Sequence, residues 1–378
     1  MSYRLRKCFL FCLLVVFVFF IPKYKNGNEE SFWQVGKNIT KEYLVRKVLY
    51  SQSVIWGFIE ELEAEVWQKK QTLVEESFLD LEIQNAILKV DDNLEEKVKK
   101  ENMAVARGSR EEFLLSQDTP FSIVEEKQVE YNLAKYKDIN ELIKQFYIVD
   151  PTAGVKKELF DIELLYGLDL HLNQEGDEPQ ILIYHTHSQE SFSNSEAGKE
   201  EDTIVGAGEI LASYLEEYGF RVLHHKGKYD VKNRDYAYSE AMPEIEKILK
   251  ANPSIQVVLD LHRDAVAEDT KLVTELQGKQ VAKVMFFNGL SCSAQQGDIS
   301  YLKNPYLQEN LAFSFQMKLA CDEYYPGFAR SIYLRAYRYN MHLCPKTLLV
   351  ELGAQTNTVE EIQGALEPLA HVLSLVLG

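Results

Sequence analysis

Hydrophobic residues are arranged in two different ways along this chain. Across residues 43–73 and 82–100, apolar side chains recur every three or four positions among charged ones, which is the spacing of amphipathic helices. Beyond about residue 180, short uninterrupted apolar runs alternate with longer periodic stretches. The pattern therefore predicts a helical N-terminal half and a C-terminal half of a different architecture.

The C-terminal half is expected to alternate strands with helices. Short apolar runs rich in branched residues predict buried strands, and three- to four-residue periodicity predicts the helices between them. The expected strands cover residues 180–184, 220–223, 255–261, 281–287 and 348–352, and the expected helices 204–218, 240–250, 306–324 and 358–377. This alternation predicts an α/β fold with a mainly parallel sheet and flanking helices.

No chemical motif occurs in the first half of the chain. Its helical segments are interrupted by a largely polar stretch at residues 101–117, which is typical of a flexible linker. We therefore expect a helical, partly flexible stalk over residues 23–161 and a catalytic domain over residues 162–378.

The first 22 residues have the composition of a membrane anchor. Arg4, Arg6 and Lys7 precede an uninterrupted apolar run that ends at Pro22. A basic flank followed by such a run predicts a signal segment, and the lack of a small-residue cleavage site after it favours an uncleaved anchor. Because basic flanks stay in the cytoplasm, we expect a single-pass protein of the cell membrane whose catalytic domain lies outside.

Charge and cysteine content exclude several functions. The net charge of −17 argues against a nucleic-acid partner, because phosphate binding needs a basic patch. No C-x-x-C pair occurs, which argues against a thiolate zinc site. Cys292, Cys321 and Cys344 are an odd number, so a complete disulfide framework is excluded and one bridge remains an alternative.

Three of the expected buried strands end at a histidine or a glutamate. His185 and His187 follow the strand at 180–184, His262 follows the one at 255–261, and Glu351 lies in the one at 348–352. In open α/β sheets, ligands bind beyond the carboxyl ends of the strands. We therefore expect these side chains to meet in one active site.

Imidazole nitrogen and carboxylate oxygen are ligands that suit zinc. His187, Glu190 and His262 would provide three ligands and leave a fourth position for water, with Glu351 as the general base. His185 is an alternative ligand to His187, because the two side chains share one face of an extended chain.

Other polar residues near these strand ends have weaker signals. Asp260 would orient a ligand histidine, or form a salt bridge with Arg263, and Arg338 is a candidate for substrate contact. A serine nucleophile is disfavoured, since no G-x-S-x-G elbow occurs. The remaining histidines, His224 among them, show no partner pattern.

These segments resemble those of the stage II sporulation protein P (SpoIIP) family. The similarity lies in residues 181–192 (Ile-Leu-Ile-Tyr-His-Thr-His-Ser-Gln-Glu-Ser-Phe), 259–265 (Leu-Asp-Leu-His-Arg-Asp-Ala), 338–340 (Arg-Tyr-Asn) and 349–353 (Leu-Val-Glu-Leu-Gly). It covers roughly residues 150–378, and the order of anchor, stalk and domain also fits the family.

The resemblance implies an activity similar to that of zinc-dependent N-acetylmuramoyl-L-alanine amidases, together with endopeptidase activity on stem-peptide cross-links. It implies septal wall remodelling and engulfment during sporulation, with peptidoglycan as substrate and SpoIID and SpoIIM as partners. His187 and His262 match the two histidine ligands by position, and Glu351 matches the catalytic glutamate.

The third metal ligand is not fixed by this resemblance. In the wider amidase family the glutamate ligand opens the helix after the first histidine, whereas here that helix opens with Asp202. Glu190 is the better candidate, and Glu200 and Glu201 stay open. Two other functions also stay open, a non-catalytic membrane-anchored wall-binding scaffold and a zinc amidohydrolase acting on another extracellular amide.

Overall fold

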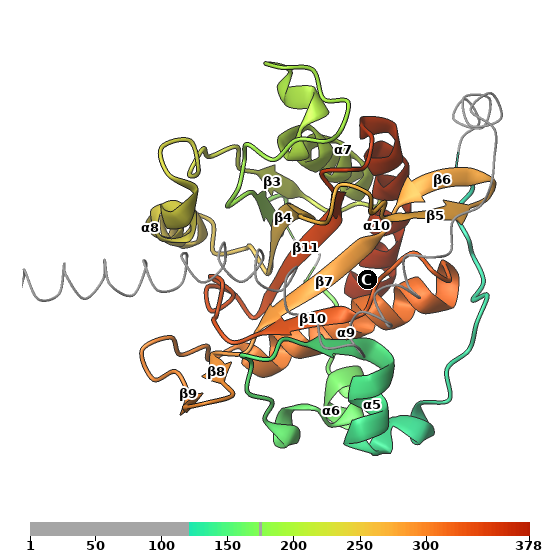
Figure 1. Ribbon diagram of the computed structural model, residues 1–378, viewed down its shortest axis with the longest axis vertical. Coiled ribbons are helices and arrows are strands. Elements are labelled where there is room, and N and C mark those ends of the chain that lie inside the picture. The colour runs from blue at the N-terminus through green and yellow to red at the C-terminus, as the bar shows by residue number, and fades with distance from the viewer. Residues whose placement is uncertain (1–120, 174–175) are drawn as a thin grey trace, which may run out of the picture. The chain divides into compact units, whose positions relative to one another are not determined.

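The computed structural model describes residues 121–173 and 176–378 (Figure 1). The anchor expected at residues 1–22 and the greater part of the expected stalk lie outside these described residues. In the described part of the chain, no helix is both long enough and apolar enough to cross a lipid bilayer.

A seven-stranded sheet forms the centre of the described part, in the order β1-β10-β7-β11-β4-β2-β3. Its strands are β1 (Tyr147–Val149), β2 (Ile181–Tyr184), β3 (Val222–His224), β4 (Val257–Asp264), β7 (Val284–Gly289), β10 (Ile332–Arg335) and β11 (Lys346–Ala354). All neighbouring strands are parallel except β7 and β11. The expected sheet, parallel in most of its pairings, is thus confirmed, with one antiparallel seam beside β11.

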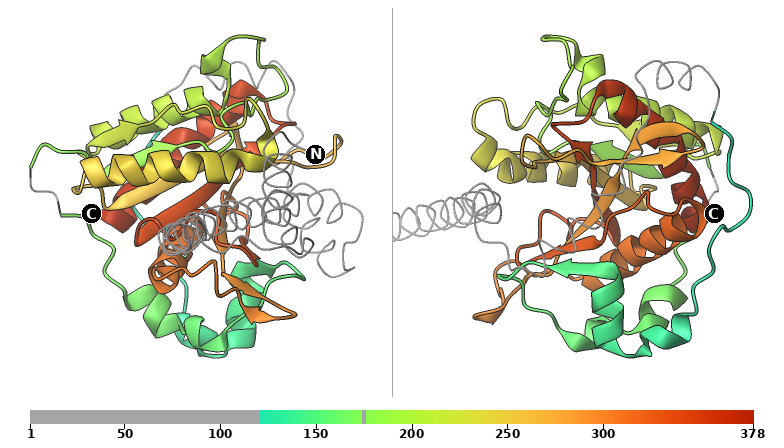
Figure 2. Two further views of the ribbon diagram at one scale, coloured as in Figure 1. Left: turned by 90° about the vertical axis from the view of Figure 1, so that its left-hand side faces the viewer. Right: turned by 45° about the vertical axis from the view of Figure 1, so that its right-hand side comes forward.

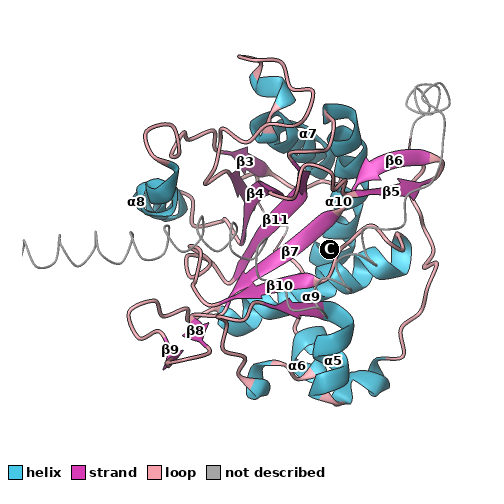
Figure 3. Cartoon of the chain, in the orientation of Figure 1, coloured by secondary structure: helices cyan, strands magenta, loops and turns pink. Residues whose placement is uncertain are grey.

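Helices flank this sheet, as the sequence predicts (Figure 3). They are α5 (Ile139–Phe146), α6 (Ile162–Gly167), α7 (Ile204–Glu217), α8 (Ala237–Ala251), α9 (Leu307–Tyr324) and α10 (Val359–Leu377), with short 3-10 turns at η2 (Leu133–Lys137), η3 (Lys157–Leu159), η4 (Glu200–Asp202) and η5 (Arg234–Tyr236). The chain can be followed through these elements in the two views of Figure 2.

Alternating side chains of each strand reach two separate apolar cores. On β2, Ile181 and Ile183 join the main core with α7, α9 and α10, whereas Leu182 and Tyr184 pack with residues of α8 on the opposite face. All four side chains are completely buried. A strand that packs against apolar residues on both faces has a continuous apolar sequence. This is why β2 can be recognised from the sequence.

The folded domain begins earlier than residue 162. β1 pairs with β10 at the edge of the central sheet, and Leu142 and Phe146 of α5 are fully buried in the main core. Further upstream, the backbone N–H groups of Gln128 and Val129 donate to the carbonyl of Glu323 in α9. Part of the segment assigned to the stalk therefore belongs to the α/β domain.

The strand expected at residues 281–287 is divided into two elements. β5 (Val273–Leu276) and β6 (Lys279–Ala282) form a hairpin, and β7 starts at Val284 in a different sheet. Gln277 and Gly278 connect the hairpin with φ values of 53° and 78°. Positive φ at both positions is the signature of a type I′ turn, whose twist matches that of the strands. A second hairpin joins β8 (Cys292–Ser293) to β9 (Gly297–Asp298).

Candidate metal centre

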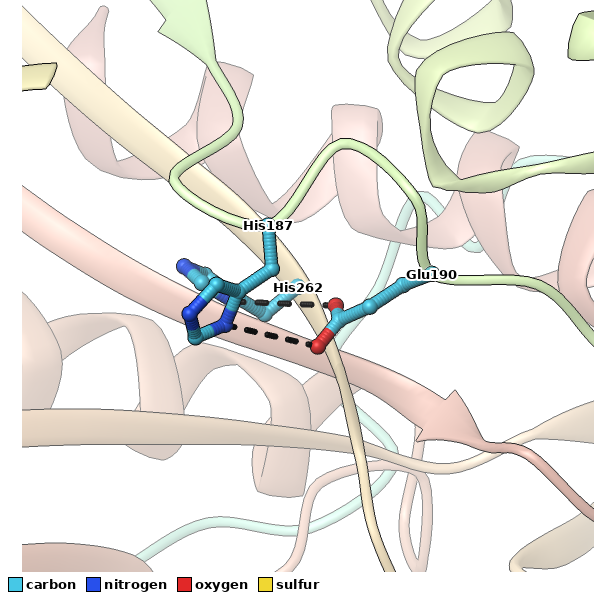
Figure 4. A group of neighbouring side chains, drawn as sticks. All are labelled: His187, Glu190 and His262. Carbon is cyan, nitrogen blue, oxygen red and sulfur yellow. Dashed lines mark ion pairs between the residues drawn. The ribbon is translucent and has the colours of Figure 1, made fainter. Parts of the chain in front are cut away.

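Three side chains converge near the carboxyl ends of β2 and β4 (Figure 4). His187 and Glu190 lie in the turn after β2, and His262 lies on β4. Nδ1 of His187 is 3.6 Å from Oε1 of Glu190, and Nδ1 of His262 is 3.6 Å from Oε2 of the same carboxylate. All three side chains are buried, and one donor atom from each lies within 4.8 Å of the others.

This donor set fits a small divalent cation. Four ligands at the 2.0–2.1 Å bond lengths of tetrahedral zinc are separated by about 3.3 Å from one another. The separations of 3.6 Å between each imidazole nitrogen and the facing carboxylate oxygen are close to that value. Two nitrogens and one anionic oxygen are also the ligand types that zinc accepts.

Two buried carboxylates hold the turn that carries His187. The backbone N–H and the hydroxyl of Thr186 donate to Asp260 at 2.9 and 2.6 Å. The hydroxyl of Ser188 donates to Asp230 at 2.8 Å. Since the chain turns immediately after β2, His187 no longer follows the alternation of the strand.

His185 consequently lies outside the group of three. Its Nδ1 is 2.9 Å from the carbonyl oxygen of Leu261, and its Nε2 is 2.8 Å from Nε2 of His224. Burial, followed by the charge of His224, lowers the pKa of His185 to about 3. The alternative in which His185 replaces His187 is therefore wrong for this geometry. His224 gave no signal in the sequence, because its partners come from distant segments.

His262 is held between two carboxylates. Its Nε2 lies 2.9 Å from Oδ1 of Asp260, an ion pair rather than a well-aligned hydrogen bond, while its Nδ1 faces Glu190. Burial opposes a charge on the ring, but Asp260 and Glu190 together keep the pKa of His262 well above its ordinary value. A carboxylate behind a histidine orients the ring and makes its other nitrogen a better metal ligand.

Glu190 is almost completely buried, yet it is a carboxylate. Burial acts to raise its pKa, but hydrogen bonding and charge from His187 and His262 keep the pKa well below its ordinary value. Oε2 of Glu190 accepts a hydrogen bond from the backbone N–H of Arg263 at 2.8 Å, and Oε1 accepts one from Nη2 of Arg234 at 2.8 Å. The contact with Arg234 was not foreseen from the sequence.

The other two glutamates considered as third ligand lie elsewhere. Glu200 and Glu201 are exposed in η4, and Glu200 forms an ion pair with Lys228 at 2.8 Å. Neither joins the group formed with His187 and His262.

Glu351 lies on the strand next to His262. The two residues are register partners between β11 and β4, immediately before an irregularity in the pairing of these strands. Oε2 of Glu351 is buried and has no hydrogen-bond partner. Burial, followed by the negative charge of Asp264, raises the pKa of Glu351 to about 8. An unpaired carboxyl group therefore stands beside the three potential ligands.

The two arginines singled out in the sequence have different surroundings. Arg263 bonds through its guanidinium to the carbonyl oxygens of Ser191 and Asp264 at 3.1 Å each, and so braces the turn after β2 rather than pairing with Asp260. Arg338 precedes Tyr339 and Asn340, whose positive φ values of 49° and 56° mark a strained segment.

An aromatic side chain that the sequence did not suggest supports the histidines. The ring of Tyr238, at the start of α8, stacks on His262 with centroids 6.3 Å apart and meets His187 edge-on at 5.7 Å. Asn340 donates to the backbone carbonyl of Tyr238 at 2.8 Å, which connects the strained segment to this ring. A single tyrosine in a helix has no sequence signature that distinguishes this role from ordinary packing.

Comparison with known families identifies the chain. A model of the stage II sporulation protein P (SpoIIP) family matches residues 67–374, which is most of its length. The chain belongs to the SpoIIP family. Stage II sporulation protein P of Bacillus subtilis (strain 168) is 26% identical to it over 218 residues, which are 53% of this chain and 51% of that protein. This SpoIIP chain therefore spans about half the length of the curated relative that it matches.

Solved amidase structures are similar to this SpoIIP chain at a low level. The CwlD amidase of Clostridioides difficile, solved with the GerS lipoprotein, has a TM-score of 0.34 and 12% identity over 52% of this chain and 98% of that chain. The N-acetylmuramoyl-L-alanine amidase AmiC2 of Nostoc punctiforme has a TM-score of 0.32 and 10% identity, and the match covers 53% of this chain and 97% of that chain. These scores carry no argument about function, which rests on the residues described above.

Proposed function

We propose that this SpoIIP-family protein is a zinc-dependent peptidoglycan hydrolase that cleaves the N-acetylmuramoyl-L-alanine amide, with stem-peptide cross-links as a second class of bond. The observation that carries the proposal is the buried group of His187, Glu190 and His262, with the unpaired carboxyl of Glu351 next to it. Metal hydrolases need this combination of three ligands and one nearby base.

In this proposal His187, Glu190 and His262 hold the metal. A zinc ion bound there would activate water and polarise the carbonyl group of the scissile amide. Asp260 holds the His262 ring in place by an ion pair with Nε2 of that histidine. The same carboxylate accepts two hydrogen bonds from Thr186 and so fixes the turn that carries His187. One carboxylate thus orients both histidines.

Glu351 transfers protons. It takes a proton from the attacking water as the water oxygen bonds to the carbonyl carbon, and gives it to the amide nitrogen as the C–N bond breaks. Burial and neighbouring carboxylates raise its pKa, which strengthens it as a base. A divalent cation beside the carboxyl would lower the pKa again and so favour the ionised form that accepts the proton.

We also propose a location and partners. The basic flank and apolar run of residues 1–22 favour an anchor in the cell membrane, with the α/β domain outside the cytoplasm at the sporulation septum. The family resemblance suggests SpoIID and SpoIIM as partners. Both suggestions rest on the sequence.

Peptidoglycan digestion by the purified full-length protein tests this function. We would compare wild type, His262→Ala, Glu351→Gln and the control Lys247→Gln, whose lysine is paired only with Glu244 on the exposed side of α8. We expect wild type and control to release stem peptides, His262→Ala to lose zinc and activity, and Glu351→Gln to keep zinc but lose activity by about 100-fold or more.

The outcomes distinguish the competing functions. Zinc binding without release of any peptidoglycan fragment would favour a zinc amidohydrolase acting on another amide. Neither zinc nor cleavage in a folded wild-type protein would refute the proposal and favour a wall-binding scaffold. Unchanged activity in Glu351→Gln would show that another group is the base.

A further inference from the structure

Arg234 contacts the candidate metal ligand Glu190 from the solvent side. It lies at the start of η5, and its Nη2 is 2.8 Å from Oε1 of Glu190. The two side chains differ greatly in exposure, at 40% for Arg234 and 1% for Glu190. A permanently charged guanidinium therefore reaches from the surface to one of the oxygens that face the histidines.

The position of Glu190 does not depend on this contact. Its Oε2 accepts the backbone N–H of Arg263 at 2.8 Å, and its own carbonyl accepts the N–H of Ile204 at 3.0 Å. Both imidazoles face the carboxylate at 3.6 Å. Because the main chain holds the glutamate at several points, Arg234 contributes charge here more than geometry.

That charge has the same sign as a metal ion. In the metal-free protein, the guanidinium adds to the stabilisation that His187 and His262 give to the buried, ionised carboxylate. A divalent cation that bound the same carboxylate would be repelled by the guanidinium at short range. Since 40% of the Arg234 side chain is exposed, the guanidinium can move toward solvent when a cation binds Glu190.

We propose that Arg234 is an exchangeable counter-ion of Glu190, which offsets the charge of the carboxylate when no metal is bound and lowers the affinity of the three-residue group for metal. This inference rests on the proposed function, because it takes the group of three to be a metal centre. The residue sets how readily the centre gains and loses its ion, and touches none of the reacting atoms.

The chain offers a closely matched control. Lys228 lies in the loop before η5 and pairs with Glu200 at 2.8 Å, so Lys228→Gln removes an equal charge without removing a contact to the Glu190 carboxylate. Arg234→Lys keeps the charge and changes its shape. Together with Arg234→Gln, these two variants separate the effect of charge at Glu190 from the effects of general charge and of guanidinium geometry.

Zinc affinity of the full-length protein, measured by competition with a chromophoric chelator, tests the inference. We expect Arg234→Gln to bind zinc about tenfold more tightly than wild type, and Lys228→Gln and Arg234→Lys to stay within about twofold. Thermal unfolding in EDTA is the second readout. Arg234→Gln should unfold at a lower temperature than wild type without metal, and should gain more than wild type from added zinc.

Weaker or unchanged zinc binding by Arg234→Gln, with zinc binding by wild type intact, would overturn the inference and leave the metal centre standing. If Arg234→Gln does not fold, Arg234→Lys decides, because a tenfold change in its affinity would contradict an effect of charge. If folded wild type binds no zinc at all, the inference and the proposed function fail together.

Discussion

Replacing Glu351 by glutamine is expected to stabilise the metal-free protein, increasingly so as the pH rises. Burial and the charge of Asp264 raise the pKa of Glu351 from the ordinary 4.5 to about 8. The folded protein then resists ionisation of this group, whereas the unfolded chain does not. The stability that the protonated carboxyl provides is complete below about pH 4.5 and is lost as the pH rises through about 8. Glutamine does not titrate, so the variant escapes this loss.

The size of the effect follows from the pH interval. Each pH unit between the unfolded and the folded pKa changes the free energy of unfolding by about 1.4 kcal/mol. At pH 7 the interval above 4.5 gives a ceiling of about 3 kcal/mol. Glu351 keeps some contact with solvent, so we expect about half of this ceiling, ~1.5 kcal/mol. For a domain of this size, that corresponds to an increase of about 3–6 °C in Tm.

Thermal unfolding in EDTA at several pH values between 5 and 8.5 measures this difference. The gap in Tm between Glu351→Gln and wild type should be small near pH 5 and widest at the alkaline end. Glu275→Gln, on the exposed side of β5, should follow wild type throughout. A gap that stayed constant with pH, or that favoured wild type at pH 8, would refute the assigned environment of Glu351.

Three further substitutions test other parts of the site. Asp260→Asn should weaken zinc binding about 10- to 100-fold in chelator competition, because the ligand histidine loses its anionic partner, and normal affinity would contradict that role. Gly208→Ala should lower the free energy of unfolding by about 1–3 kcal/mol in urea titration, because the added Cβ would lie 2.7 Å from Nε2 of both His185 and His224. Asn194→Ala should cost about 1 kcal/mol in the same assay, since its side chain accepts the N–H of Val359 at the start of α10, and no loss would mean that this hydrogen bond is dispensable.

The sequence indicates candidate ligands where the signal is local. A buried apolar run that ends in a histidine or glutamate can be recognised without any tertiary information, and this pattern indicates His187, His262 and Glu351. Glu190 is a candidate because it closely follows the first of these runs. The structure brings these four side chains together. Their chemical roles remain predictions until metal binding and activity are measured.

The sequence fails where distant residues decide the local geometry. His185 and His187 are equivalent in an extended strand, and the turn that separates them depends on Asp260 and Asp230, far along the chain. The same limitation applies to Arg234, which meets Glu190 only through tertiary structure. No periodic pattern can indicate such contacts.

Strand direction and domain boundaries were missed for related reasons. The apolar run at residues 281–287 indicates a strand, but not that β7 runs antiparallel to β11. β1 has only three residues, too few for a recognisable pattern, and its partner β10 follows much later in the sequence. The early start of the domain therefore could not be read from hydrophobicity.

The position of β11 has a consequence for when the protein becomes competent during synthesis. β11 is the last strand in the chain, yet it lies in the middle of the sheet, between β4 and β7. Until it has emerged, those two strands have no partner along their facing edges, and the nascent polypeptide lacks Glu351 although both histidines are already present. Pairings between distant segments form late in folding, so we expect β11 to insert between β4 and β7 as a late step. The candidate metal centre, with Glu351 beside it, is thus complete only after β11 has been synthesised.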